Sequence, residues 1–231
     1  MKRLLTMLGT AGFLGTMLLT GGCGGGGGGS APATAPAPVS TSATVTGATV
    51  NTNGTATTST TTTTVVSAPA SAPAAVASVA VSMPPSTTIT AQDASGNTIT
   101  LASAPTFTFL APGNATTASS GTSNVPLPVT GGFTAVRSTA VAVNVEITGS
   151  AKATFSNPIT ITLPVPGKAP GTVITTMYMS KEDSQGYQVI GGPYTVSANG
   201  TINITVSNLC WFIGDPEFET ATGSTGGVSG R

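Results

Sequence analysis

The sequence predicts an all-β protein: an antiparallel, immunoglobulin-like β-sandwich preceded by a disordered tether. Two observations predict the sandwich. From residue 85 onward, short apolar segments alternate with polar residues and are separated by turn-rich stretches at intervals of about 8–12 residues, and no segment has a helical period. One observation predicts the tether: residues 23–84 are rich in Gly, Ala, Thr, Ser and Pro and carry no charge.

The first expected strands lie between residues 86 and 111. The stretch TTITAQDASGNTITLA predicts two strands joined by a turn at Asp93–Asn97, because Asp, Gly and Asn are typical turn residues. The stretch TFTFLAP places Phe107 and Phe109 on one face of the next strand. Residues 111–132 consist largely of Gly, Ser, Thr, Asn and Pro, which predicts a long loop.

Three further strands are expected between residues 138 and 180. Each shows the alternation of a strand with one buried face. The residues expected to be buried are Val141, Val143, Val145 and Ile147 in STAVAVNVEIT, Ile159, Ile161 and Leu163 in NPITITLPVP, and Val173, Thr175, Met177 and Met179 in TVITTMYMS.

Two more segments are expected to close the domain. After the polar turn KEDSQG, the stretches YQVIGGPYTV and TINITVSNLCWFI are joined by SANG, in which Asn-Gly is a strong hairpin signal. The β-sandwich domain is therefore expected to span residues 85–213, a length sufficient for one hydrophobic core. Residues 214–231 have turn composition and are expected to form a flexible tail.

The tether is expected to span residues 23–84. A segment so poor in large apolar side chains cannot bury enough surface to offset the entropy cost of ordering. Its expected role is to hold the domain away from a membrane, and its Thr, Ser and Pro content also suits O-glycosylation. An alternative is that Val76, Val79, Val81 and Met83 supply a first strand.

The first 22 residues have the layout of a signal peptide. Lys2 and Arg3 form a short positive segment, and Leu4–Leu19 is apolar and uncharged. This run is shorter than the roughly 20 apolar residues that span a bilayer. The order of these features favours export over a membrane-spanning anchor.

The stretch LLTGGC, ending at Cys23, resembles a bacterial lipobox. The resemblance implies that Cys23 receives a diacylglyceryl group and becomes the new N-terminus, with Thr20 in the place of the usual Leu. Several acyl chains on one residue would hold the chain stably on a membrane. By resemblance to enterobacterial sorting, Gly24 after the cysteine favours the outer membrane of a Gram-negative bacterium. The alternative is an ordinary secretory signal with an incidental cysteine.

Residues 133–213 resemble a bacterial surface module related to the ZU-type sandwich of ankyrins and netrin receptors and to the C-terminal half of GAIN domains. The stretches that carry the resemblance are TFSNPITITLPVP, VITTMYMSKEDSQGYQVIGG and YTVSANGTINITVSNLCWF. It implies a structural or interaction role. In self-cutting relatives a His lies two residues before the nucleophile of the final strand. Here Asn208 precedes Cys210, so we expect Cys210 to be a small packing residue in an uncut chain.

Composition excludes several functional classes. The chain has no His, which removes every Ser-His, Cys-His and His-zinc arrangement and leaves a serine nucleophile without its usual base. Without the first 22 residues, five basic and seven acidic side chains remain, so no basic surface for nucleic acid is expected. We therefore expect no enzymatic activity, no cofactor and no metal.

The remaining polar and aromatic candidates have simpler interpretations. Glu182 and Asp183 are expected at a solvated hairpin tip, and the Asp93–Asn97 segment is an Asx-type turn before it is a calcium site. Three acidic residues are expected in the loose tail, and four aromatic residues could line a sugar-binding face, with Trp211 and Tyr187 as the principal candidates. These residues are Asp215, Glu217 and Glu219 in the tail, and Tyr178, Tyr187, Tyr194 and Trp211 among the aromatics.

Taken as a whole, the sequence predicts a lipid-anchored structural or interaction protein at the outer membrane or cell surface. Its partners would be the membrane, through the acyl chains, and a protein or polysaccharide. Two alternatives stay open: a carbohydrate-binding or adhesion module, and a degenerate autoproteolytic module.

Overall fold

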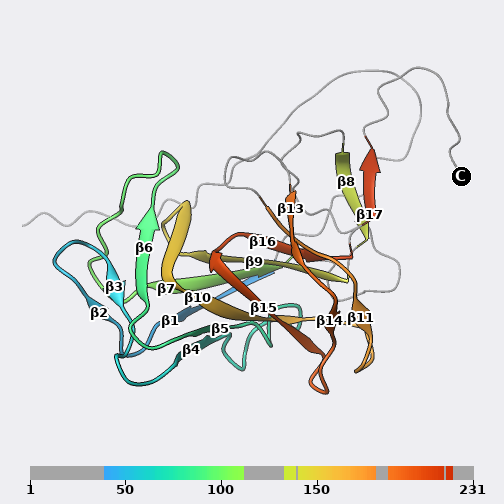
Figure 1. Ribbon diagram of the computed structural model, residues 1–231, viewed down its shortest axis with the longest axis horizontal. Coiled ribbons are helices and arrows are strands. Elements are labelled where there is room, and N and C mark those ends of the chain that lie inside the picture. Colours follow the sequence, from blue (N-terminus) through green and yellow to red (C-terminus); the bar gives the residue numbers. More distant parts are fainter. Residues whose placement is uncertain (1–38, 112–132, 139, 181–186, 216, 221–231) are drawn as a thin grey trace, which may run out of the picture. The chain divides into compact units, whose positions relative to one another are not determined.

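The computed structural model describes residues 39–111, 133–138, 140–180, 187–215 and 217–220. Contacts divide the chain into Met1–Thr34 and Ala35–Arg231, and all the described residues belong to the second unit. They fold into antiparallel β-strands without any helix, which confirms the all-β class (Figure 1). Within these ranges no helix is long and apolar enough to cross a membrane.

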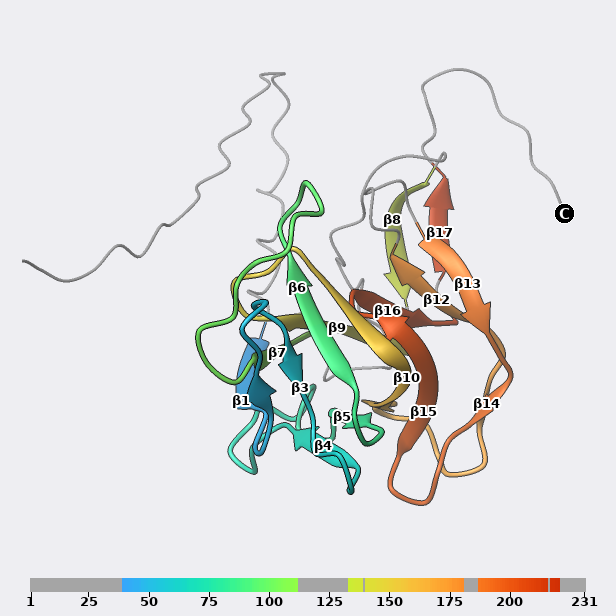
Figure 2. The same ribbon diagram turned by 60° about the vertical axis from the view of Figure 1, so that its left-hand side comes forward.

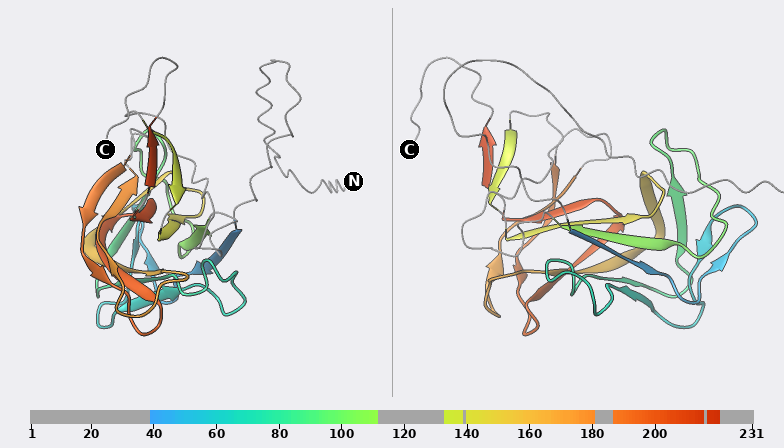
Figure 3. Two further views of the ribbon diagram at one scale, coloured as in Figure 1. Left: turned by 90° about the vertical axis from the view of Figure 1, so that its right-hand side faces the viewer. Right: turned by 180° about the vertical axis from the view of Figure 1, so that it is seen from behind.

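One sheet has six strands and combines both ends of the described chain. From behind, β1, β7 and β9 run side by side (Figure 3). The strand order is β1 (Val39–Thr44), β7 (Thr106–Ala111), β9 (Val141–Ile147), β16 (Trp211–Gly214), β12 (Met177–Ser180) and β13 (Tyr187–Gly191).

The other large sheet has seven strands, with β10 at its centre. β6, β10 and β15 pass in front of β9 in Figure 2. The order of six of its strands is β2 (Thr49–Val50), β3 (Ala56–Thr57), β6 (Thr88–Gln92), β10 (Lys152–Pro164), β5 (Ala80–Met83) and β4 (Thr64–Ser67). The seventh strand, β15 (Thr201–Asn208), also pairs with β10, along the edge that β5 and β6 do not use.

Two short pairs complete the strands. One is β11 (Val173–Ile174) with β14 (Tyr194–Thr195), and the other is β8 (Phe133–Ser138) with β17 (Glu217–Thr220). β8 and β17 stand apart from the large sheets at the upper right of Figure 1.

A single hydrophobic core joins the inner faces of the two large sheets. Phe107 of β7 stacks on Phe109 with ring centroids 6.5 Å apart, and on Phe155 of β10 at 6.4 Å, so aromatic contacts connect one sheet to the other. The expected alternation is confirmed in β9 and β10: Val141, Val143, Val145, Ile147, Ile159, Ile161 and Leu163 are all buried.

β10 pairs with two different strands of its sheet along its length, because it bends. Residues Lys152–Phe155 pair with β6, whereas Thr160–Thr162 pair with β5. The register with β15 shifts between Thr154 and Ile159, where Pro158 cannot donate a backbone hydrogen bond. Such irregularities bend a strand. Sequence alternation correctly placed the buried residues but did not show this division.

The expectation of a disordered tether up to residue 84 is wrong for residues 39–84. This segment forms β1 to β5 and contributes fully buried side chains. The alternative considered for it is confirmed only in part. Val81 and Met83 lie in a strand, but this strand, β5, is the fifth and not the first, and Val76 and Val79 are buried outside it. Many small apolar side chains, buried in the common core, take the place of the large ones that the composition lacks. Residues 23–38 lie outside the described residues.

Three other expectations need correction. Val173 and Thr175 are exposed, because the strand breaks after Ile174 and the buried face resumes at Met177. The stretch TINITVSNLCWFI is two strands in different sheets, which separate at Leu209 and Cys210. The tail is not wholly irregular, since Glu217–Thr220 forms β17.

Candidate functional site

The structure places the sequence-predicted site residues in different surroundings. Cys23, Glu182 and Asp183 lie outside the described residues. Tyr187 opens β13, opposite Ser180, but its side chain is not described. Trp211 opens β16 and is half-buried. The structure therefore describes the side chain of only one of the two principal aromatic candidates.

Trp211 lies on the outer face of the six-stranded sheet. It pairs with Asn144, whereas the next pair, Phe212 and Val143, faces the core. Tyr178 pairs with Ile213 and so shares the outer face with Trp211. Tyr194 lies in the separate β11–β14 pair and packs against the core. The fold therefore brings two of the aromatic candidates together and separates a third.

Glu146 lies on this outer face, two positions after Asn144 in β9. Asn144 Nδ2 donates a hydrogen bond to Glu146 Oε2 at 3.1 Å. Burial raises the pKa of Glu146 above its ordinary value, and the bond from Asn144 opposes that rise only in part. The sequence analysis did not select these two residues, although the NVE stretch places both on the outward side of β9.

Asp93 forms the expected Asx-type turn. Its Oδ1 accepts from the backbone N–H groups of Ser95 and Asn97, both at 2.9 Å, and its Oδ2 accepts from Asn97 Nδ2 at 3.0 Å. These bonds, led by that of the Asn97 side chain, lower the pKa of Asp93. Among the described residues, no three His, Cys, Asp or Glu side chains are grouped so that they could hold a metal ion.

Asp215 is a structural clamp rather than a solvated tail residue. Its carboxylate accepts from Thr175 Oγ1 at 2.7 Å, Thr176 N at 3.0 Å and Thr175 N at 3.2 Å. Its own N–H donates to Thr176 O at 2.9 Å, and its φ of 43° is in the left-handed region. These bonds hold the break between β11 and β12, which explains why the predicted alternation fails there.

Cys210 lies at the corner where the chain leaves one large sheet for the other. It is half-exposed, packs against the core, and its thiol donates to Trp211 O at 3.5 Å. The preceding Leu209 is buried. With no His in the chain, the corner contains no imidazole to activate the thiol.

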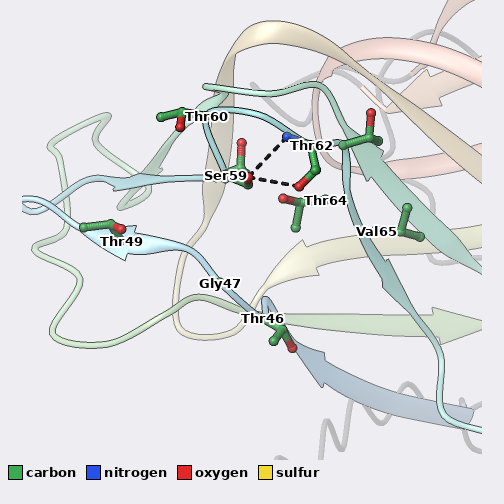
Figure 4. Close-up of a pocket in the computed structure, with 10 residues that line it drawn as sticks. Thr46, Gly47, Thr49, Ser59, Thr60, Thr62, Thr64 and Val65 are labelled. Atoms are coloured by element: carbon green, nitrogen blue, oxygen red, sulfur yellow. Dashed lines mark hydrogen bonds between the residues drawn. The ribbon is translucent and has the colours of Figure 1, made fainter.

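A hydroxyl-lined pocket lies within the segment that the sequence analysis assigned to the tether. We call it the threonine groove; its volume is about 580 Å³. Seven threonines and one serine line it, and no lining side chain is charged (Figure 4). They come from the turn after β1, from β2, from the β3–β4 connection and from β4; the complete lining is Thr46, Gly47, Thr49, Thr58, Ser59, Thr60, Thr62, Thr63, Thr64 and Val65.

The β3–β4 connection is fixed by hydrogen bonds at its start. Thr58 is buried and makes two hydrogen bonds with Thr87, both of 3.0 Å. The backbone N–H of Thr58 donates to Thr87 O, and the backbone N–H of Thr87 donates to Thr58 Oγ1. Ser59 O accepts from Ser86 N at 2.8 Å, and Ser59 Oγ accepts from the N–H and hydroxyl of Thr62 at 3.2 and 3.0 Å (Figure 4). The wall of the groove is therefore ordered without any ligand.

The sequence offered one signal for this groove. The tract TATTSTTTTTVVS is uncharged and repetitive, which suggested disorder, but Thr and Val are also β-branched residues that favour strands.

Comparisons with protein-family models, with curated proteins and with solved structures find no match to this chain. The fold and the geometry alone therefore define its class: an all-β protein with two packed antiparallel sheets.

Proposed function

We propose that this chain is a lipid-anchored structural or interaction protein of a Gram-negative cell envelope. The observation that carries the proposal is the order of features before Cys23: two positive residues, an apolar run, small residues and then the cysteine. The acyl chains would anchor the chain to the outer membrane. The β-domain, which begins by Val39, would then lie much closer to the anchor than a tether reaching residue 84 would place it.

The surface of the domain is consistent with an interaction role. The outward residues of β15 and of the second half of β10 are Thr, Ser and Asn rather than charged residues, as in Thr160 and Thr162 of β10 and Asn203 and Thr205 of β15. Such a surface does not attract ions or nucleic acid by charge. It suits a partner recognised through neutral hydrogen bonds and shape.

A carbohydrate-binding role is the second candidate. The observation in its favour is that Trp211 and Tyr178 share the outer face of one sheet, with Asn144 opposite Trp211. Aromatic faces combined with amide groups are suited to sugar rings. Trp211→Ala should abolish glycan binding if this face is the binding site.

The two cysteines provide a matched test of the anchor. Cells expressing the wild type, Cys23→Ser or Cys210→Ser are fed an alkyne-labelled fatty acid and then fractionated. The wild type and Cys210→Ser should carry the label and stay with the membranes, whereas Cys23→Ser should lose both, because the acyl chains supply the membrane affinity. A Cys23→Ser chain that remains labelled and membrane-bound would overturn the proposal.

A further inference from the structure

We infer that the threonine groove is a binding site for a neutral saccharide. The inference rests on the interaction role proposed above but not on the lipid anchor, and it concerns a surface different from the face that contains Trp211. The groove has a volume of about 580 Å³, within the range of about 300–1,000 Å³ that is usual for small-ligand sites. That volume accommodates one or two sugar rings.

The hydroxyl of Thr64 is the strongest sign of a ligand. Thr64 begins β4 and is only 8% exposed, yet among the described residues its hydroxyl has no hydrogen-bond partner. Buried polar groups are almost always paired, and an unpaired one costs stability. A ligand that enters the groove and bonds to this hydroxyl would remove that cost.

The other hydroxyls of the groove are placed to share the same ligand. Thr46, Thr49 and Thr60 are exposed, and their hydroxyls make no hydrogen bond within the described part of the chain. A threonine hydroxyl can both donate and accept, as can each hydroxyl of a sugar. The groove therefore offers several two-way hydrogen-bonding groups to a ligand of the same chemistry.

The lining also excludes other ligand classes. No Lys or Arg is present for a phosphate or carboxylate, and no Asp or Glu for a hard cation. A wholly apolar ligand would leave the hydroxyls unpaired. Val65, 57% exposed at the edge of the groove, offers one apolar contact to the C–H face of a sugar ring. Because Ser59 and Thr58 already fix the wall, binding would require little loop ordering.

The test uses the purified full chain in detergent, so that it is independent of membrane attachment. Maltose, cellobiose, lactose and diacetylchitobiose are titrated by calorimetry, with digalacturonate as the charged comparison. Co-sedimentation with insoluble cellulose and chitin distinguishes a polymer-bound source from a free sugar. We expect binding of at least one neutral saccharide and none of digalacturonate. Absence of binding to all six neutral probes, or binding of digalacturonate alone, would overturn the inference.

Thr64→Val separates a ligand-binding role from a structural one. Valine has the same branched shape, so the variant should melt at a higher temperature while binding the saccharide about three- to tenfold more weakly. Thr49→Val should weaken binding similarly without changing the melting temperature. Thr195→Val, at an exposed position of β14, and Trp211→Ala should leave binding unchanged. Unchanged affinity in both groove variants, or loss of binding in Trp211→Ala alone, would show that the groove is not the site.

Discussion

Residues 39–92 bury mostly Val and Ala, whereas residues 140–214 bury mostly Ile, Val, Phe and Leu, yet the two segments share one core. Strands from both segments take part in each large sheet: β7 separates β1 from β9 in one, and β10 pairs directly with β5 and β6 in the other. The N-terminal segment is therefore an integral half of the sandwich, although its composition is that of a linker. In this low-complexity segment the buried side chains are smaller, but buried and exposed positions still alternate along the strands.

The largest expected effect compares two buried methionines, one from each segment. Met83 and Met177 are both fully buried. Met83→Ala and Met177→Ala should each lower the free energy of unfolding by about 2–5 kcal/mol, because each leaves a cavity in the same core. Chemical denaturation followed by tryptophan fluorescence measures both.

Val65→Ala is the matched control for the N-terminal segment. Val65 is 57% exposed in β4, so its truncation should change the free energy of unfolding by no more than about 0.5 kcal/mol. The contrary result would be a large loss in the free energy of unfolding for Met177→Ala and a loss for Met83→Ala as small as that for Val65→Ala. Residues 39–84 would then not belong to the core, and the original prediction of a linker would be supported.

The comparison also shows which parts of the fold the sequence could predict. β9 and the second half of β10 were predictable because Val, Ile and Leu alternate with smaller or polar residues. β4 and β5 were less predictable, because their sequences, TVVS and AVSM, contain too few large apolar residues to be distinguished from the surrounding Ala, Ser and Thr. The threonine groove was hidden for the same reason, since most of its hydroxyls belong to β4 and to the β3–β4 connection before it.

Other features depend on contacts that no local pattern contains. The break after Ile174 requires the carboxylate of Asp215, some 40 positions later in the chain. The change of sheet at Leu209 and Cys210 requires neighbours from β9 and β10, since TINITVSNLCWFI alternates well enough to suggest one strand. Trp211 lies on the outer face of its sheet, and the residue opposite it, Asn144, could be identified only from the strand register.

An intermediate effect is expected at the Asp215 clamp, which has no counterpart in the N-terminal segment. Asp215→Ala removes three hydrogen bonds to Thr175 and Thr176 and places alanine at a φ of 43°. It should lower the free energy of unfolding by about 1–3 kcal/mol. Asp215→Asn, which keeps an oxygen acceptor and tolerates that φ, should cost less. If denaturant titrations gave the wild type and both variants the same free energy of unfolding, Asp215 would be a solvated residue without a structural role.

The smallest expected effects come from one carboxylate in each segment, and they have opposite signs. The pKa of Asp93 is lowered by its hydrogen bonds, chiefly from Asn97, so its contribution to stability is present above the unfolded pKa and is lost as the pH falls through the folded one. The pKa of Glu146 is raised by burial, so the ionised group destabilises the fold as the pH rises from the unfolded pKa through the folded one. Asp93→Asn should therefore melt slightly lower than the wild type at neutral pH, and Glu146→Gln slightly higher. Both differences should vanish in acid, below each group's lower pKa. Melting temperatures recorded from neutral to acidic pH measure this pair, and two variants that shift in the same direction would contradict the assignment of hydrogen bonding to one carboxylate and burial to the other.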